Sequence, residues 1–282
     1  MSEKSIIPFH NFGGKGKVIH FAHANGYPPE GYKQFVQPFL DNYEIIASKY
    51  RPLWGDRNPN EVKHWNVFAD DLIRFMDEKG LTKVIGMGHS MGGTISSIAA
   101  MKRPDLFEQL VLIDPVIFPK TYDLWTKFLP NSFLKRMIPI AKASLKRRDQ
   151  WESKQEVYHS WRKKRVFKKF SDSVLKDFID AAIVPSPKGG VTLAYPKAWE
   201  TQVYVTAPYI FSDLVKIQIP LTVIKGEHSN VITDGLWEKW QQKQPNAHLI
   251  EYKSAGHLVP MEYPILLADT IMKQIKVNAI IN

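Results

Sequence analysis

The chain contains no cysteine, no long apolar run and no excess of acidic over basic residues. The absence of cysteine excludes disulfide bonds and thiolate catalysis, and it fits a reducing compartment. Residues 1–8 lack the apolar stretch of a signal peptide, and nowhere do about eighteen apolar residues follow one another, so no transmembrane span is expected. We therefore expect a cytoplasmic protein.

The composition is that of a folded domain, because 44% of the 282 residues are apolar and 12% are aromatic. One large core, or one core with an insertion, is expected. The net charge of +10 is unevenly placed. Residues 119–205 hold 18 basic and 8 acidic residues, so this middle segment carries the whole excess and the remainder is balanced.

A serine at the end of a predicted strand is the strongest chemical signal. Residues 83–93 read KVIGMGHSMGG, a β-branched run that breaks into glycines around Ser90. The pattern G-x-S-x-G predicts a strand, a sharp turn and a helix, with the glycines leaving room for the turn. The helix beginning at Met91 directs its first amides and its positive dipole end toward the Ser90 hydroxyl.

Strands and helices are predicted to alternate around this turn. Apolar runs predict strands at 18–22, 44–48, 109–113, 221–224 and 248–252 besides the one before Ser90. Amphipathic patterns predict helices through 32–40, 67–80 and 265–277. From about residue 118 the pattern becomes basic and aromatic, and it predicts helices without strands, with a loop at 184–190.

Together with a late Gly256-His257 pair, these features resemble the α/β-hydrolase family over nearly the whole chain. The resemblance implies an α/β fold with a mostly parallel central sheet flanked by helices. It also implies a helical cap inserted at 118–205, with the core formed by 1–117 and 206–282. Members of this family carry a catalytic triad in the order serine, acid, histidine.

His257 is the expected base. A serine hydroxyl is a poor nucleophile until a histidine, itself held by an acid or a carbonyl, accepts its proton. His257 follows the last predicted strand, at the sheet end where open α/β folds bind ligands. The alternative is a histidine that caps the last helix.

The acid is predicted to be Asp114. The family usually places an aspartate in the loop after strand 221–224, where this chain has Ser229 and Asn230. Asp114 ends the strand next to that of the nucleophile, a position from which some similar hydrolases take their acid. Glu227 and Asp234 are the alternative acids. The alternative for Asp114 itself is a structural role, in which its carboxylate accepts hydrogen bonds from loop amides before Pro115.

The oxyanion hole is expected from two backbone amides. One is that of Met91. The loop at 23–29 resembles the family's His-Gly-aromatic-Pro element with Asn25 in place of the histidine, and this alignment makes the amide of Tyr27 the second donor. A shift of register would give that role to Asn25 or Gly26, and a simple turn is the other interpretation.

Three further residues are candidates for contact with substrate: His89, Asn25 and Trp125. For His89 the alternative is packing beside the turn. Trp54 falls where the family has a glycine-rich turn, and it is either structural or part of the pocket wall.

No metal or other cofactor is expected. His20 and His23 lie near a strand end with no third ligand nearby in the sequence. The basic middle segment is either a solvated surface or a site for an acidic carrier or an anionic surface. Nucleic acid is not expected as a partner, because the aromatic residues of the basic middle segment have helical spacing.

The expected function is hydrolysis of a carboxylic ester or related acyl bond, with an apolar acyl group, through an acyl-serine. Two alternatives stay open. One is a thioesterase that recruits a carrier- or CoA-linked acyl group, and the other is a ligand-binding member of the fold without catalysis.

Overall fold

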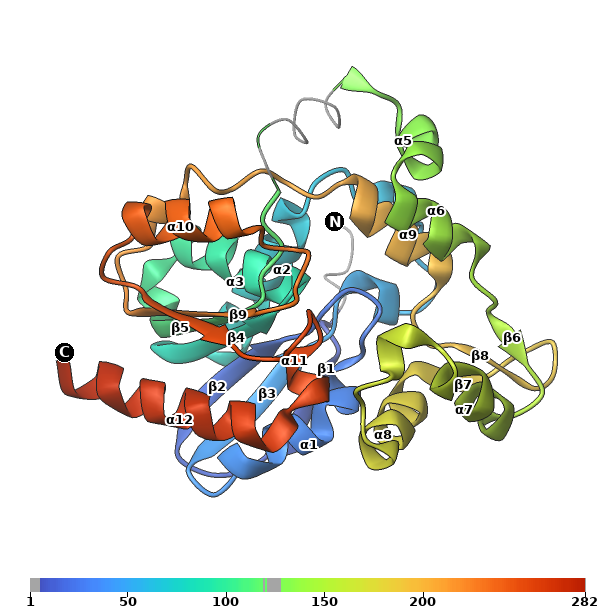
Figure 1. Cartoon of the computed structure of the whole chain (residues 1–282), viewed down its shortest axis with the longest axis horizontal. Coiled ribbons are helices and arrows are strands. Elements are labelled where there is room, and N and C mark those ends of the chain that lie inside the picture. Colours follow the sequence, from blue (N-terminus) through green and yellow to red (C-terminus); the bar gives the residue numbers. More distant parts are fainter. Residues whose placement is uncertain (1–5, 119, 121–127, 282) are drawn as a thin grey trace.

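The structure is a computed structural model that describes residues 6–118, 120 and 128–281. Its centre is a seven-stranded sheet in the order β1-β3-β2-β4-β5-β9-β10 (Figure 1). The strands pair in parallel, except that β1 runs antiparallel to β3. The strands are β1 (Phe9–Gly13), β2 (Lys17–Ala22), β3 (Tyr43–Ser48), β4 (Val84–His89), β5 (Phe107–Ile113), β9 (Leu221–Gly226) and β10 (His248–Tyr252).

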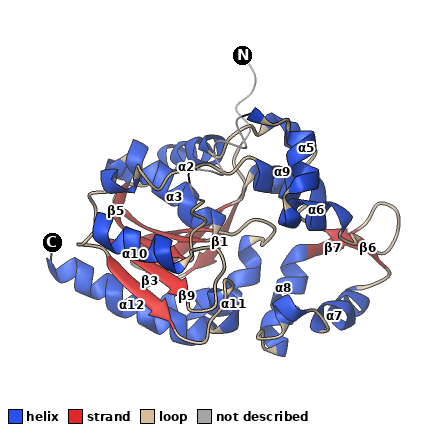
Figure 2. Cartoon of the chain, turned by 45° about the horizontal axis from the view of Figure 1, so that its top comes forward, coloured by secondary structure: helices blue, strands red, loops and turns tan. Residues whose placement is uncertain are grey.

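Helices cover both faces of this sheet (Figure 2). Along β5, Val111 and Ile113 join the core cluster that includes α1 and α12, whereas Leu110 and Leu112 join the cluster that includes α2, α3 and α10. This alternation is that of a strand buried on both sides. The helices are α1 (Lys33–Val36), α2 (Asn66–Lys79), α3 (Met91–Lys102), α10 (Asp234–Lys243), α11 (Val259–Glu262) and α12 (Pro264–Ile281).

The predicted fold class is confirmed, with two local differences. Strand β1 was not predicted. The helix expected through 32–40 is broken into η1 (Pro29–Tyr32), α1 and η2 (Gln37–Phe39). Pro38, the second residue of η2, has no N–H to continue an α-helical ladder.

Residues 131–205 lie outside the central sheet, on the right in Figure 1. Helices alone were predicted there, and that prediction is wrong in part. A three-stranded antiparallel sheet in the order β6-β8-β7 is also present. The elements are α5 (Asn131–Met137), α6 (Pro139–Lys146), β6 (Gln150–Trp151), α7 (Lys154–Arg162), η6 (Arg165–Phe167), α8 (Asp172–Ala182), β7 (Ile183–Pro185), β8 (Val191–Leu193) and α9 (Lys197–Val205).

The predicted loop at 184–190 is the turn of a hairpin between β7 and β8. Gly189 and Gly190 adopt positive φ, and the Ser186 amide donates to the Gly190 carbonyl at 3.0 Å. The Pro- and Gly-rich composition marks the turn but conceals the short strands beside it. The boundaries of the cap at 118 and 205 remain a prediction.

Of the helices in the described ranges, none combines the length and hydrophobicity that crossing a bilayer requires.

Helix α3 is held unusually close to the sheet. Its residues from Met91 to Ala100 are all buried. A Cβ on Gly92 would lie 2.0 Å from the backbone oxygen of Ala22, the last residue of β2. The first turn of α3 therefore lies directly against the end of β2, so Ser90 is brought beside the loop that follows β2.

The substitution Gly92→Ala is expected to destabilise the fold. The clash is with backbone, which has little room to move, so we expect a loss of about 1–3 kcal/mol. Urea titration followed by circular dichroism measures it. Gly235 in α10 has no atom within 4 Å of an added Cβ. Gly235→Ala should therefore be neutral or stabilising by up to about 1 kcal/mol, and equal losses in both variants would contradict the close approach at Gly92.

Candidate active site

Ser90 lies at the predicted sharp turn between β4 and α3. Its φ of 57° and ψ of −121° are rare for a residue with a side chain, and such strain is retained where neighbours enforce it. The Ser90 amide donates to the carbonyl of Ile113 on the adjacent strand at 2.9 Å. A Cβ on Gly88 would lie 2.5 Å from the backbone oxygen of Gly92. The two glycines of the motif thus allow the turn.

His257 comes to Ser90 from 167 residues further along the chain. It lies in the loop between β10 and α11, and its Nε2 is 2.9 Å from the Ser90 Oγ. Its side chain keeps 25% exposure. This is the distance at which a base accepts a hydroxyl proton.

Asp114 completes the arrangement from the end of β5. Its Oδ2 lies 2.6 Å from the His257 Nδ1, on the ring side opposite to Ser90. Asp114 has a positive φ of 43°, its amide donates to the carbonyl of Ile224 at 2.6 Å, and its side chain is fully buried. The structure therefore brings together the three residues that the sequence analysis selected.

Ser229 supports the acid. It occupies the loop after β9, where the family usually has an aspartate, and its hydroxyl donates to the Asp114 Oδ2 at 2.5 Å. The same Oγ accepts from the amide of Val231 at 3.2 Å. The loop that lacks the usual acid thus contributes a hydrogen bond to the acid on β5. Sequence analysis placed Ser229 in this loop but did not predict that contact.

The two alternative acids lie elsewhere. Glu227 accepts from the Ser254 amide at 2.7 Å and pairs with Lys253 at 3.3 Å. Asp234 is an exposed residue at the start of α10 and pairs with Lys225 at 2.5 Å. Neither carboxylate contacts His257.

The loop after β2 differs from the prediction. The Tyr27 amide donates to the carbonyl of Ala24 at 3.2 Å, and Gly26 has a φ of 79°, as in a type II turn. The Tyr27 N–H is therefore already used, which contradicts its predicted role as an oxyanion donor. Among the described hydrogen bonds none occupies the amide of Asn25 or Gly26.

The amide of Met91 stays a prediction as the first oxyanion donor. Met91 is the first residue of α3, where backbone N–H groups have no acceptor within the helix. It follows Ser90 directly, so this amide lies beside the nucleophile. Asn25 binds in a different way, since its Nδ2 donates to the carbonyl of Glu200 on α9 at 3.1 Å. Its Oδ1 is buried and has no partner in the described part of the chain.

His89 is not placed to contact a substrate, which corrects that prediction. Its side chain is fully buried, and its Nε2 donates to the backbone carbonyl of His257 at 2.9 Å. Because that nitrogen donates, its Nδ1 accepts from the Tyr32 hydroxyl at 2.8 Å. Burial, followed by the nearby His257, lowers the pKa of His89 from 6.5 to about 3. His89 is thus a neutral support for the backbone of the base.

Tyr32 extends this chain of hydrogen bonds to the loop after β2. Its hydroxyl accepts from the amide of Ala24 at 3.2 Å while it donates to His89. One continuous path thus links the turn at Ala24 to the backbone of His257. No sequence signal pointed to Tyr32 beyond its apolar helical spacing.

The histidines on and after β2 have structural partners. His20 Nε2 lies 3.0 Å from the Ser48 Oγ, and His23 Nδ1 lies 2.9 Å from the carbonyl of Ala24. Burial lowers the pKa of His20 to about 3 and that of His23 to about 4. Within residues 6–118, 120 and 128–281 no group of three metal-ligating side chains occurs.

A cavity of about 300 Å³ lies between the loop after β2 and the segment between β5 and β9. Its walls combine the loop residues Gly26 and Tyr27 with aromatic rings and an ion pair. The other lining residues are Arg147, Trp161, Lys164, Val166, Phe167, Phe178, Ala182, Leu193, Tyr195, Glu200 and Tyr204. The Arg147 Nη2 lies 2.5 Å from the Glu200 Oε2, so these two residues form an ion pair in the cavity wall. The candidate substrate residue Trp125 lies outside the described residues.

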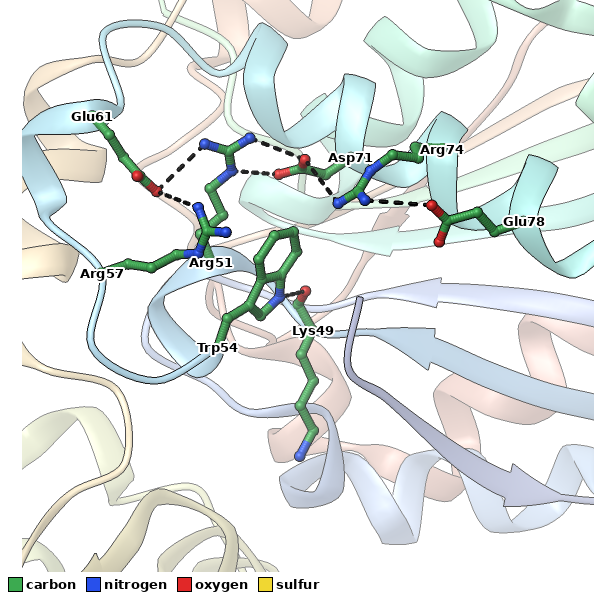
Figure 3. A network of polar contacts seen from close by, with 8 residues as sticks. All are labelled: Lys49, Arg51, Trp54, Arg57, Glu61, Asp71, Arg74 and Glu78. Carbon is green, nitrogen blue, oxygen red and sulfur yellow. Dashed lines mark hydrogen bonds and ion pairs between the residues drawn. The ribbon is translucent and has the colours of Figure 1, made fainter. Parts of the chain in front are cut away.

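Trp54 belongs to a polar network and is absent from the walls of that cavity (Figure 3). Its Nε1 donates to the carbonyl of Lys49 at 2.6 Å, and the guanidinium of Arg57 lies 5.1 Å from its ring centre. Arg51 pairs with Asp71 of α2 at 2.6 Å. The network ties the loop after β3 to α2, which favours the structural interpretation of Trp54.

Comparison with known proteins identifies the family and supports the fold. The family described as alpha/beta hydrolase fold matches residues 47–264. An uncharacterized hydrolase, YugF of Bacillus subtilis (strain 168), is 25% identical over 87% of this chain and 85% of its own length. The (lyso)-N-acylphosphatidylethanolamine lipase of Homo sapiens is 23% identical over 70% of this chain and 60% of its own. The crystal structure of E-2-(acetamidomethylene)succinate hydrolase superposes with a TM-score of 0.79 at 19% identity, covering 95% of this chain and 94% of that one.

The depressed pKa of His89 predicts a pH-dependent stability. Between pH 6.5 and about 3 the unfolded chain binds a proton at this histidine that the folded chain does not bind. The free energy of unfolding therefore falls as the pH falls through 6.5, and from pH 7 to pH 5 this group alone accounts for roughly 2 kcal/mol. Urea titrations measure the free energy of unfolding at both pH values. The difference between pH 7 and pH 5 should be smaller in His89→Gln than in wild type by that amount. His228→Gln, at an exposed position, should retain the full difference, and an unchanged difference in His89→Gln would contradict the neutral buried state.

Proposed function

This chain belongs to the alpha/beta hydrolase fold family, and from that premise we propose that it cleaves a carboxylic ester, or a related acyl bond, through an acyl-serine intermediate. The observation that carries the proposal is the continuous contact from Ser90 Oγ to His257 Nε2, at 2.9 Å, and from His257 Nδ1 to Asp114 Oδ2, at 2.6 Å. The hydrolase and lipase names of the relatives support the class of reaction.

In the first half of the reaction His257 accepts the Ser90 proton while the Ser90 oxygen attacks the acyl carbon. The imidazolium that forms faces the buried Asp114 carboxylate, which stabilises it. The bond between the acyl carbon and the leaving oxygen then breaks, and His257 returns the proton to the leaving alcohol. In the second half water replaces the alcohol, the same base accepts its proton, and the acid product leaves with Ser90 restored.

The negative charge on the acyl oxygen needs two donors. We assign the first to the Met91 amide and the second to the amide of Asn25 or Gly26, because the Tyr27 amide is engaged with Ala24. A donor of this kind contributes about 10²–10³ in rate. The reaction proposed here uses side chains, backbone amides and water.

We assign a small or branched acyl group with an apolar body to the cavity beside Gly26 and Tyr27, whose lining does not include Ser90 or His257 themselves. Rings of Trp161, Phe167 and Phe178 form much of its wall, and a volume of about 300 Å³ is at the small end of ligand sites. The unpartnered Oδ1 of Asn25 is a candidate acceptor for a substrate N–H or O–H. Trp125 stays a candidate from the sequence.

A fluorophosphonate probe tests the nucleophile. Wild-type protein should be labelled at one serine because His257 activates only Ser90, and Ser90→Ala should not be labelled. Intact-mass spectrometry measures both. If wild type stays unlabelled, or if Ser90→Ala is labelled equally, the proposed hydrolysis through Ser90 is wrong. An unlabelled wild type would favour a binding protein with this fold.

The acid is tested by two carboxylate-to-amide changes. Asp114→Asn should lower kcat for a p-nitrophenyl ester by about 10³–10⁴, since the imidazolium loses its buried counter-charge and the ring loses its orientation. Glu227→Gln should change kcat by less than about twofold, because its partly exposed carboxylate binds Lys253 and the Ser254 amide rather than His257. Matching thermal transitions would show that both variants are folded. The reverse order of effects would move the acid to Glu227.

A further inference from the structure

Helices α5 and α6 expose an unusual amount of apolar side chain. They lie at the upper right of Figure 1, remote from the central sheet. Five large apolar residues between positions 128 and 145 are each at least 39% exposed. These are Phe128, Phe133, Met137, Ile140 and Leu145. On α5, Phe133 and Met137 are four residues apart and so share one face of the helix.

The same segment is strongly basic. Residues 128–148 include six basic side chains and no acidic one. Arg136, Lys142 and Lys146 are exposed, and no ion pair to a described residue involves them. We call the five apolar residues and these three bases the α5–α6 patch.

The inner face of the helices explains how the segment is attached. Leu134 and Ala141 form a small cluster with Val205 of α9, to which Ile138 adds from the edge. The residues of the α5–α6 patch are exposed, and none of them belongs to this cluster. Exposed apolar groups of this size commonly mark an interaction surface.

We propose that the α5–α6 patch docks the protein onto an anionic lipid bilayer. Apolar side chains between lysines and arginines are the composition of helices that lie in a membrane interface, where rings and aliphatic chains enter the acyl region and the bases meet acidic headgroups. Acidic groups on a carrier protein would satisfy the bases alone, whereas a bilayer also takes up exposed apolar side chains such as Phe133 and Met137. The combination therefore favours lipid.

Docking there would bring the cavity close to the membrane. The Ser144 Oγ of α6 donates to the Glu200 carboxylate at 2.9 Å, and Arg147, which follows α6, pairs with the same group. Both Arg147 and Glu200 line the cavity. An acyl substrate dissolved in the bilayer would then enter from the docked side. The docking itself goes beyond the proposed hydrolysis and does not require it.

Vesicle co-sedimentation tests the proposal with the full-length chain. Wild type should bind vesicles of phosphatidylglycerol and phosphatidylcholine, bind pure phosphatidylcholine vesicles much less, and lose binding as salt increases. Arg136→Glu combined with Lys142→Glu should lower the partition coefficient at least tenfold, because each basic side chain removed is expected to lower it about fivefold. Phe133→Ser combined with Met137→Ser should weaken it comparably, because the patch then lacks groups to insert.

Matched controls come from α12, on the opposite side of the molecule in Figure 1. Lys273→Glu with Lys276→Glu, and Ile265→Ser with Leu266→Ser, change the same chemistry at exposed positions and should bind as wild type. All variants should hydrolyse a short water-soluble ester equally, which separates loss of docking from loss of the proposed catalysis. Equal loss in the α12 variants, unchanged binding in the patch variants, or binding to an acidic carrier protein without binding to vesicles would overturn the proposal.

Discussion

The candidate active site depends on one buried carboxylate. Asp114 has no exposed surface. Its Oδ2 lies 2.6 Å from the His257 Nδ1 and 2.5 Å from the Ser229 hydroxyl, while its Oδ1 has no hydrogen-bond partner among the described residues. A buried charge is tolerated only where partners replace the water it has lost. The ends of β5, β9 and β10 therefore have to converge at this point, and the loops that follow them are constrained by the needs of one oxygen atom.

A second set of contacts holds the base from behind. His89 precedes the nucleophile, and its ring joins the carbonyl of His257 to the hydroxyl of Tyr32. Because the ring stays neutral, one nitrogen donates and the other accepts, and both bonds have a fixed direction. Displacement of the loop that bears His257 would break a buried hydrogen bond as well as the contact with Ser90. The variable position of the G-x-S-x-G motif thus has a structural use in this chain.

Much of this arrangement could be predicted from local patterns. The turn at Ser90, the strand before His257 and the strand that ends at Asp114 each have a short-range signature, and parallel strands bring their carboxyl ends to one edge. The role of the Tyr27 amide was not predictable, because a shift of two residues in a loop changes which N–H is free. The hydroxyl of Ser229 and the ring of Tyr32 act through long-range contacts that no spacing reveals. The strands β7 and β8 were not predicted, because strands of three residues have too few positions to show an alternation of apolar and polar side chains.

The position of the acid on β5 affects the order in which the site is assembled. Ser90 and Asp114 belong to one strand-helix-strand unit and follow adjacent parallel strands, whereas His257 is supplied by the loop after the last strand. On a ribosome the nucleophile and the acid are therefore synthesised well before the base. A chain that ended before residue 257 would hold Ser90 without the group that accepts its proton.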